Sequence, residues 1–261
     1  NKCTFCSMYK EKQFRIRSID ELIEEIDKVA VSYPDVRKIF IADGDALMIK
    51  TSDLKKLIEY MWSSFGKLER IGIYASPKSI HLKTDEELLR LRESGLGMAY
   101  LGLESGNEVI LQRVKKGDSR EGLIMAGKKI KFAGIKLSVT AISGLGGKEL
   151  WKEHAQDTAS AVNLMKPDFL GLLTLMDETA TELHDSIEKG EFNVLTPREA
   201  AIETILMIEN LDCEGLVFRS NHASNYFALK GTLNSDRDKM IKELKDAMRY
   251  EDFRDESARR L

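Results

Sequence analysis

The sequence predicts an α/β protein built on a mainly parallel sheet with helices outside it. Short apolar segments of strand length alternate with longer amphipathic segments along the chain. Gly, Asp, Ser or Pro residues bound the apolar segments, as they do in buried parallel strands. Because the composition does not change along the chain and no Pro/Gly/Ser-rich linker interrupts it, we expect one parallel-stranded domain, either an open doubly wound sheet or a barrel.

Strands and helix starts can be assigned in order. Six segments have the length and composition of strands: residues 36–42, 70–75, 98–103, 136–142, 168–176 and 215–219. Ser18 opens a capping box before the first helical pattern, and Thr84 starts another that stops at Gly95. Thr196, followed by Pro197 at the first helical position, starts a third.

The remaining segments are assigned from weaker signals. One helix is expected to begin at Thr51 or Ser52, and the last long helix at Ser235. Residues 177–196 form the longest excursion between strand and helix, with a short helix expected over residues 179–190. The charged residues at the end of the sequence are expected to be frayed.

Composition and charge exclude several classes of protein. Hydrophobic residues make up 43% and charged residues 32% of the chain, as in ordinary globular proteins. The formal net charge of −3 gives no basic footprint for nucleic acid, and Lys115 and Lys116 are expected on a solvated helix face. No apolar stretch approaches the ~20 residues of a membrane span. With three cysteines in all, we expect a reducing, cytoplasmic location and no membrane association.

Glycine and polar residues gather where the predicted strands end, which is where α/β proteins bind ligands. The segments are Asp43-Gly44-Asp45, Tyr74-Ala75-Ser76-Pro77, Glu104-Ser105-Gly106, Ser143–Gly147 and Arg219–Asn225. Each one alone is also explained as a strand-to-helix turn with a cap. Together they suit a small zwitterionic ligand that carries a ribose. Neither a G-x-G-x-x-G nor a Walker A motif is present, so dinucleotide and nucleoside triphosphate sites are rejected.

Two cysteines, Cys3 and Cys6, stand only two residues apart. A zinc or redox site is one interpretation of this spacing. Zinc needs a second ligand pair, which the sequence lacks, and a redox pair needs a helix directly after Cys3, which the following residues do not favour. Cys213, the third cysteine, is expected to be a buried apolar residue.

The cysteine pair, followed in order by DGDA, GLESG and SGLGG, resembles the radical S-adenosylmethionine (radical SAM) superfamily, and most closely its coproporphyrinogen-dehydrogenase-like and methylthiotransferase-like branch. The resemblance covers residues 1–176. It implies a partial, open TIM-like (β/α) barrel whose core, residues 1–176, lacks its first strand. Residues 177–249 would then extend the same barrel with elements on the substrate side, and residues 250–261 would be a charged tail.

The resemblance also implies the cofactors and the residues that bind them. In this family a C-x3-C-x2-C loop holds a [4Fe–4S] cluster, and Cys3 and Cys6 match its second and third cysteines; the first is expected upstream of residue 1, together with the first strand. Asp43-Gly44-Asp45 matches the segment that meets the methionine amino group. With Ser76, the residues expected to bind S-adenosylmethionine are Asp43, Gly44, Asp45, Glu104, Ser105, Ile142 and Gly144.

The function implied is that of a radical SAM enzyme, an oxidoreductase or transferase. It would cleave S-adenosylmethionine reductively to a 5′-deoxyadenosyl radical, which abstracts hydrogen from an unidentified small or macromolecular substrate. An electron donor such as flavodoxin or ferredoxin and an anaerobic host are expected. His222 and Arg219 are candidate catalytic residues.

An alternative interpretation is a non-catalytic barrel that has lost the cluster and serves as a binding or scaffold module. With two cluster cysteines in place of three, the 261-residue chain is expected to hold little or no stable cluster and to be inactive.

Overall fold

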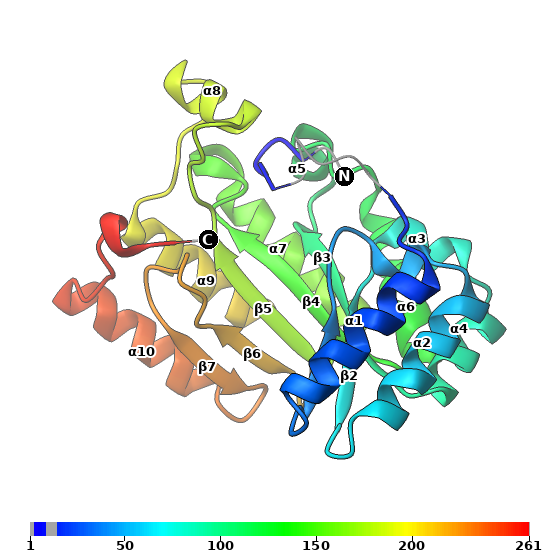
Figure 1. Ribbon diagram of the computed structural model, residues 1–261. Coiled ribbons are helices and arrows are strands. Elements are labelled where there is room, and N and C mark those ends of the chain that lie inside the picture. Colours follow the sequence, from blue (N-terminus) through cyan, green and yellow to red (C-terminus); the bar gives the residue numbers. More distant parts are fainter. Residues whose placement is uncertain (1–2, 9–14, 261) are drawn as a thin grey trace. The chain divides into compact units, whose positions relative to one another are not determined.

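The computed structural model describes residues 3–8 and 15–260 (Figure 1). The strands are β1 Lys38–Ile41, β2 Arg70–Tyr74, β3 Leu96–Glu104, β4 Lys136–Ser143, β5 Phe169–Thr174, β6 Val217–Ser220 and β7 Leu229–Thr232. The α-helices are α1 Ile19–Ser32, α2 Thr51–Ser64, α3 Pro77–Leu82, α4 Asp85–Glu93, α5 Glu108–Arg113, α6 Arg120–Phe132, α7 Gly147–Met165, α8 Glu182–Glu188, α9 Pro197–Asn210 and α10 Arg237–Tyr250. Two short 3₁₀ helices are η1 Ala46–Met48 and η2 Glu256–Ala258.

In the part of the chain that the structure describes, seven strands form one open sheet in chain order, from β1 to β7. The pairs β1–β2, β2–β3 and β5–β6 are parallel, whereas β7 pairs with β6 in the antiparallel direction. The expected fold class, α/β with a mainly parallel sheet that does not close, is therefore confirmed. The antiparallel edge strand β7 was not predicted. Its sequence, LKGT, has one large apolar residue and a glycine, so its composition is not that of a strand.

The described residues form two compact units. Unit 1 takes in residues 3–8, 102–125 and 139–260, and unit 2 takes in residues 15–101 and 126–138. The two long strands β3 and β4 each contribute residues to both units.

Unit 2 has a core of aliphatic side chains from α2, α4, β2 and β3. Leu54, Ile58, Ile71 and Leu88 are among its fully buried members. The capping box predicted at Ser18 is present at the start of α1. Thr84, predicted as a helix start, is the N-cap of α4 and forms a second capping box with Glu87.

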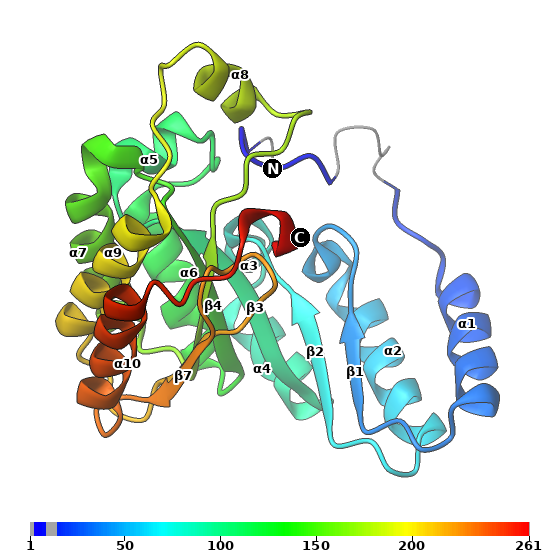
Figure 2. The same cartoon turned by 90° about the vertical axis from the view of Figure 1, so that its left-hand side faces the viewer.

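In unit 1, α7 packs along α9 (Figure 1, Figure 2). The capping box at Thr196 is present at the start of α9, with Pro197 at its first position. The last helix begins at Arg237 and not at Ser235, because the Ser235 hydroxyl donates to the carbonyl of Thr232 within a turn and Asp236 takes the N-cap position. No helix among the described residues is long and apolar enough to cross a membrane.

The last described residues pack against other parts of unit 1, so the expectation of a frayed tail is wrong. Arg259 is only 5% exposed. Its guanidinium donates to the carbonyl oxygens of Ser224 (2.6 Å) and Leu175 (2.5 Å) and lies 4.0 Å from the centre of the Tyr226 ring. An arginine fork that binds backbone carbonyls and stacks on an aromatic ring orders the segment around it.

Candidate active site

The loop that carries Cys3 and Cys6 is anchored on both sides within unit 1. The N–H of Thr4 donates to the carbonyl of Val114 at 3.0 Å, and the carbonyl of Thr4 accepts from the N–H of Leu183 at 3.0 Å. The ring of Phe5 packs against an apolar cluster supplied by α5, the end of β4 and α8. The two residues between the cysteines thus fix the loop, and Cys3 itself is 8% exposed.

A buried ion pair lies beside Cys3. Lys116 Nζ is 2.8 Å from Glu104 Oε1, and the two side chains are 4% and 14% exposed. A Cβ on Gly102 would come within 2.2 Å of that carboxylate oxygen, so the glycine makes room for the pair. Burial raises the pKa of the Cys3 thiol, while the Lys116 charge acts to lower it and the Glu104 charge to raise it. The expectation that Lys116 lies on a solvated face is therefore wrong. Lys116 is buried because it pairs with Glu104, an acid twelve residues earlier in the chain.

The end of β3 is held in an uncommon backbone conformation. Glu104 has a φ of +62°, and the N–H of Ser105 donates back to the carbonyl of Leu103 at 2.8 Å. The Ser105 hydroxyl, fully buried, bonds to Nδ1 of His154 at 2.9 Å. A strained residue of this kind persists only where its surroundings hold it, and such residues cluster at functional sites. The Glu104 side chain thus keeps a small exposed fraction, 14%, whereas Ser105 is fully buried and its hydroxyl is bonded to His154.

The end of β4 is held by a buried acid. Oε2 of Glu203, on α9, accepts from the Ser143 hydroxyl at 2.6 Å and from the N–H of Gly144 at 2.8 Å. Gly144 has a φ of +84°, which a glycine adopts without strain. Oε1 of Glu203 has no hydrogen-bond partner among the residues that the structure describes. Burial raises the pKa of this carboxyl to about 7.

In unit 2, the structure brings Asp45 and Ser76 together. One carboxylate oxygen of Asp45 accepts from the N–H of Ser76 at 3.1 Å and from the hydroxyl of Ser79 at 2.6 Å, and the other accepts from the hydroxyl of Ser76. Ser76 also caps α3. Asp43 and Gly44 precede this cluster with φ angles of +67° and +68°, and the side chain of Asp43 is exposed.

These contacts predict different roles for the two aspartates. Asp45→Ala removes the acceptor for three donors, so the free energy of unfolding should fall by about 1–3 kcal/mol. Asp43→Asn, which tolerates the positive φ of this position and removes the charge, should leave it within about 0.5 kcal/mol of the wild-type value. If Asp43 meets the amino group of S-adenosylmethionine, its variant should instead lose affinity for that ligand. Urea denaturation and ligand titration of both variants measure this, and equal destabilisation would contradict the assignment.

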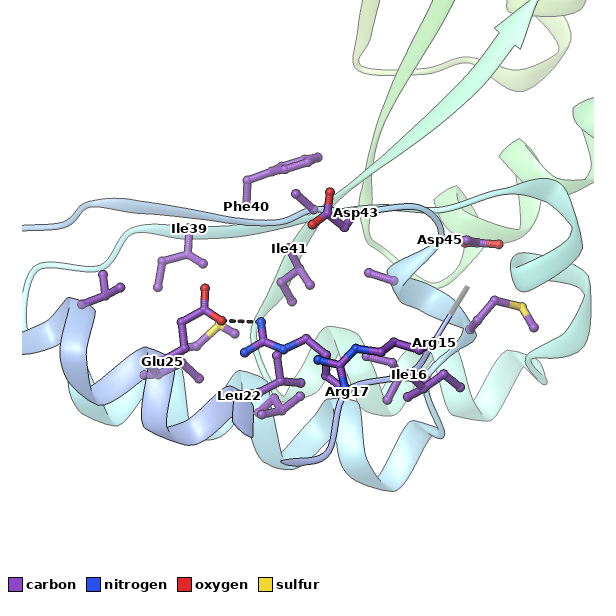
Figure 3. A pocket seen from close by; sticks show the side chains of 18 of the residues that line it. Arg15, Ile16, Arg17, Leu22, Glu25, Ile39, Phe40, Ile41, Asp43 and Asp45 are labelled. Carbon is purple, nitrogen blue, oxygen red and sulfur yellow. Dashed lines mark hydrogen bonds and ion pairs between the residues drawn. The ribbon is translucent and has the colours of Figure 1, made fainter. Parts of the chain in front are cut away.

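A pocket of about 350 Å³ lies in unit 2, with α1 on one side and strand β1 and helix α2 on the other (Figure 3). Its walls are mainly aliphatic side chains such as Leu22, Ile39 and Ile41, with Asp43 and Asp45 among its lining residues. Figure 3 shows these two aspartate side chains pointing in different directions. Arg15, Arg17 and Glu25 also line the pocket, and Arg17 is ion-paired with Glu25. The lining is therefore mixed in character, and we assign no ligand to this pocket.

The two candidate catalytic residues lie near the end of β6, and most of their hydrogen bonds are to neighbouring residues. Nδ1 of the exposed His222 accepts from the N–H (3.2 Å) and the hydroxyl (3.0 Å) of Ser224. The Arg219 guanidinium donates to the carbonyl of Phe218 at 2.8 Å. A neutral His222 therefore carries its proton on Nε2. Among the described residues, the hydrogen bonds of His222 and Arg219 join them to backbone groups, to Ser224 and to Arg254, and to no carboxylate.

The loop at the start of the described chain offers two thiols, those of Cys3 and Cys6, as metal ligands. Among the described residues no group of three His, Cys, Asp or Glu side chains could hold a metal ion. Cys3 and Cys6 lie on one anchored turn, in which the N–H of Cys6 donates to the carbonyl of Cys3 at 3.3 Å. They fit as two of the three thiolates of a [4Fe–4S] site, which leaves one further thiolate to be supplied.

Sequence reasoning missed three buried polar residues of unit 1, namely Lys116, His154 and Glu203. Glu203 alone left a signal, because it interrupts the apolar run AAIETILMI in α9. No motif singles out His154, and Lys116 stands in an ordinary Lys-Lys pair.

Comparison with known proteins assigns this chain to a family. Residues 1–159 match the model of the radical SAM superfamily. The heme chaperone HemW of Bacillus subtilis is 18% identical over 225 residues, which are 82% of this chain and 58% of HemW. The chain thus spans less than two thirds of that relative's length.

Solved structures agree in fold. The coproporphyrinogen III oxidase HemN of Escherichia coli, a radical SAM enzyme, superposes with a TM-score of 0.60 and 16% identity, covering 80% of this chain and 50% of HemN. Elp3 of Methanocaldococcus infernus superposes with a TM-score of 0.58 and 17% identity, covering 90% of this chain and 59% of the Elp3 chain. These matches confirm the expected partial TIM-like fold of the radical SAM type.

Proposed function

Because the chain belongs to the radical SAM superfamily, whose members bind a [4Fe–4S] cluster and S-adenosylmethionine, we propose that it cleaves S-adenosylmethionine reductively to a 5′-deoxyadenosyl radical that abstracts hydrogen from a substrate. The observation that carries the proposal is the anchored Cys3–Cys6 loop beside the buried Glu104–Lys116 pair, within the matched residues. The reduced cluster, when bound, supplies the electron for this cleavage.

The chain's own residues have separable tasks in this proposal. Cys3 and Cys6 supply two thiolates, and the contacts of Thr4 and the packing of Phe5 hold their turn in place. Glu104 presents its carboxylate to the ribose hydroxyls of the ligand, which can donate to it. The Lys116 ammonium pairs with that carboxylate and places a positive charge beside the thiolate of Cys3.

The other predicted ligand residues complete the proposed site. Gly144 has no side chain, so an adenine can lie against the end of β4, next to Ile142. Asp43, Gly44 and Asp45, with Ser76, are proposed as residues that bind the methionine end. A flavodoxin or ferredoxin is proposed as the electron donor, and the substrate stays open.

The experiment is anaerobic reconstitution of the full natural chain with iron and sulfide, followed by reduction with dithionite in the presence of S-adenosylmethionine. We expect iron, visible absorbance and 5′-deoxyadenosine. Cys3→Ala and Cys6→Ala should lose all three, because each removes a cluster thiolate.

Cys213→Ala is the matched control, since Cys213 is also buried but contacts Val162 and Asn163 far along the chain. It should keep both cluster and product. Absence of 5′-deoxyadenosine from a protein that holds its cluster would contradict the proposed reaction. Ligand binding that survives Cys3→Ala and Cys6→Ala, with no product from any form, would favour a binding module instead.

A further inference from the structure

Three side chains of α7 hold three consecutive residues at the end of β3. The bonds run from Ser105 Oγ to His154 Nδ1 (2.9 Å), from Gly106 N to Thr158 Oγ1 (2.9 Å) and from Asn107 Nδ2 to Asp157 Oδ2 (2.6 Å). Residues three and four apart share one helix face, so a single face of α7 makes all three contacts. A Cβ on Gly106 would lie 2.2 Å from the carbonyl oxygen of Asp157, which shows that the loop backbone lies directly on the helix.

His154 also reaches the end of β4. Its Nε2 lies 2.9 Å from the carbonyl oxygen of Ile142. Because a carbonyl only accepts, Nε2 must carry the proton, and Nδ1 must accept from the Ser105 hydroxyl. The imidazole is fully buried, and burial lowers its pKa to about 4, so the ring is neutral at ordinary pH.

The bond to His154 leaves the Ser105 hydroxyl no freedom. Its oxygen accepts from the N–H of Asn107 at 3.0 Å while its proton is donated to the imidazole. One ring thus links Ser105, directly after the strained Glu104, with Ile142, two residues before Gly144. A rigid link between two strand ends fixes the groups beside them more closely than either loop alone would.

We infer that His154 is a positioning residue for S-adenosylmethionine: as a buried strut between the ends of β3 and β4, it sets the spacing between Glu104, on the ribose side, and Gly144, on the adenine side. This inference rests on the proposed function, which assigns those two positions to the ligand. His154 itself does not touch the ligand.

The test measures binding of S-adenosylhomocysteine to the cluster-loaded natural chain by calorimetry. His154→Phe keeps the ring volume and removes both hydrogen bonds, so we expect affinity to fall about tenfold or more, as misplaced binding groups do. His154→Gln can still accept from Ser105 and donate to Ile142, and should restore most of the affinity. Should His154→Phe not fold, His154→Asn, whose shorter amide reaches one partner at most, takes its place.

A second readout separates positioning from stability. Thr204→Val removes an equally buried hydroxyl bond on α9, to the carbonyl of Ala200, and should leave affinity unchanged. In the ligand-free protein, hydrogen exchange at the amides of Gly106 and Asn107 should speed up in His154→Phe and not in Thr204→Val. If the wild type binds and His154→Phe binds as tightly, the inference fails alone. If the wild type does not bind, the proposed function fails and the inference fails with it.

Discussion

Replacing Lys116 with methionine should lower the free energy of unfolding by about 3–5 kcal/mol, the usual cost of leaving one member of a buried ion pair without its partner. Lys116 and Glu104 are 4% and 14% exposed, and their charged atoms are 2.8 Å apart. Methionine fills the space of the lysine stem, so the loss would come from the Glu104 carboxylate, which burial and a lost cation both destabilise.

The neighbouring residue gives a matched control. Lys115 pairs with Glu182 at 2.6 Å, but its side chain is 55% exposed, so Lys115→Met should cost at most about 1 kcal/mol. The double variant Lys116→Met with Glu104→Gln removes the unpaired charge and should recover part of the lost stability. Urea denaturation of the four proteins measures these values, and equal effects at Lys115 and Lys116 would show that the pair is not buried in solution.

The same variants should change the chemistry of Cys3. The Lys116 charge acts to lower the pKa of the Cys3 thiol, against the larger effect of burial. Removing it should therefore raise that pKa and slow the alkylation of Cys3 by iodoacetamide in the metal-free protein. Lys115→Met should leave the alkylation rate unchanged.

Local chemistry explains which features of the fold could be predicted. The boundaries at Ser18, Thr84 and Thr196 were accessible because a capping box is formed by residues only three apart. The parallel strands were accessible because their apolar runs are bounded by turn residues. The edge strand β7 was not, since its antiparallel pairing with β6 depends on a neighbour and not on its own composition.

The buried polar groups could not be predicted for a related reason. A lysine is predicted to be solvated unless its partner is known. Glu104 and Lys116 lie on opposite sides of α5 in the sequence, and only the folded chain brings them together. His154 joins two strand ends that lie 37 residues apart, at Ser105 and Ile142. Family resemblance supplied the candidate ligand residues, whereas the side chains that hold them come from helices that carry no motif.

Glu203→Gln should become more stable relative to the wild type as the pH rises from 5 to 8. Burial raises the pKa of the Glu203 carboxyl from 4.5 to about 7. Over that interval the unfolded chain loses this proton while the folded protein keeps it, so the contribution to stability is complete below pH 4.5 and is lost as the pH rises through 7. At about 1.4 kcal/mol per pKa unit, the full loss is about 3 kcal/mol.

The contribution of His154 to stability changes with pH in the opposite direction. Its pKa falls from 6.5 to about 4, so its contribution is complete above pH 6.5 and is lost as the pH falls toward 4. Between pH 5 and 6.5 the two effects nearly cancel in the wild type. A flat pH profile of the wild type alone would therefore not show that both groups are unperturbed, and the variant is needed to separate them.

Urea denaturation at pH 5, 6, 7 and 8 measures the difference in unfolding free energy between Glu203→Gln and the wild type. The glutamine carbonyl can accept from Ser143 and Gly144 as the carboxyl does, but it does not ionise. The difference should rise by about 2 kcal/mol between pH 5 and pH 8, while Glu209→Gln, at an exposed position on the same helix, should give a constant difference.

Parallel profiles for Glu203→Gln and the wild type would mean that Glu203 titrates near its ordinary pKa. The oxygen that lacks a partner would then have to be stabilised by water or by a movement of α9, and the loop at Gly144 would be held less rigidly than its two hydrogen bonds indicate.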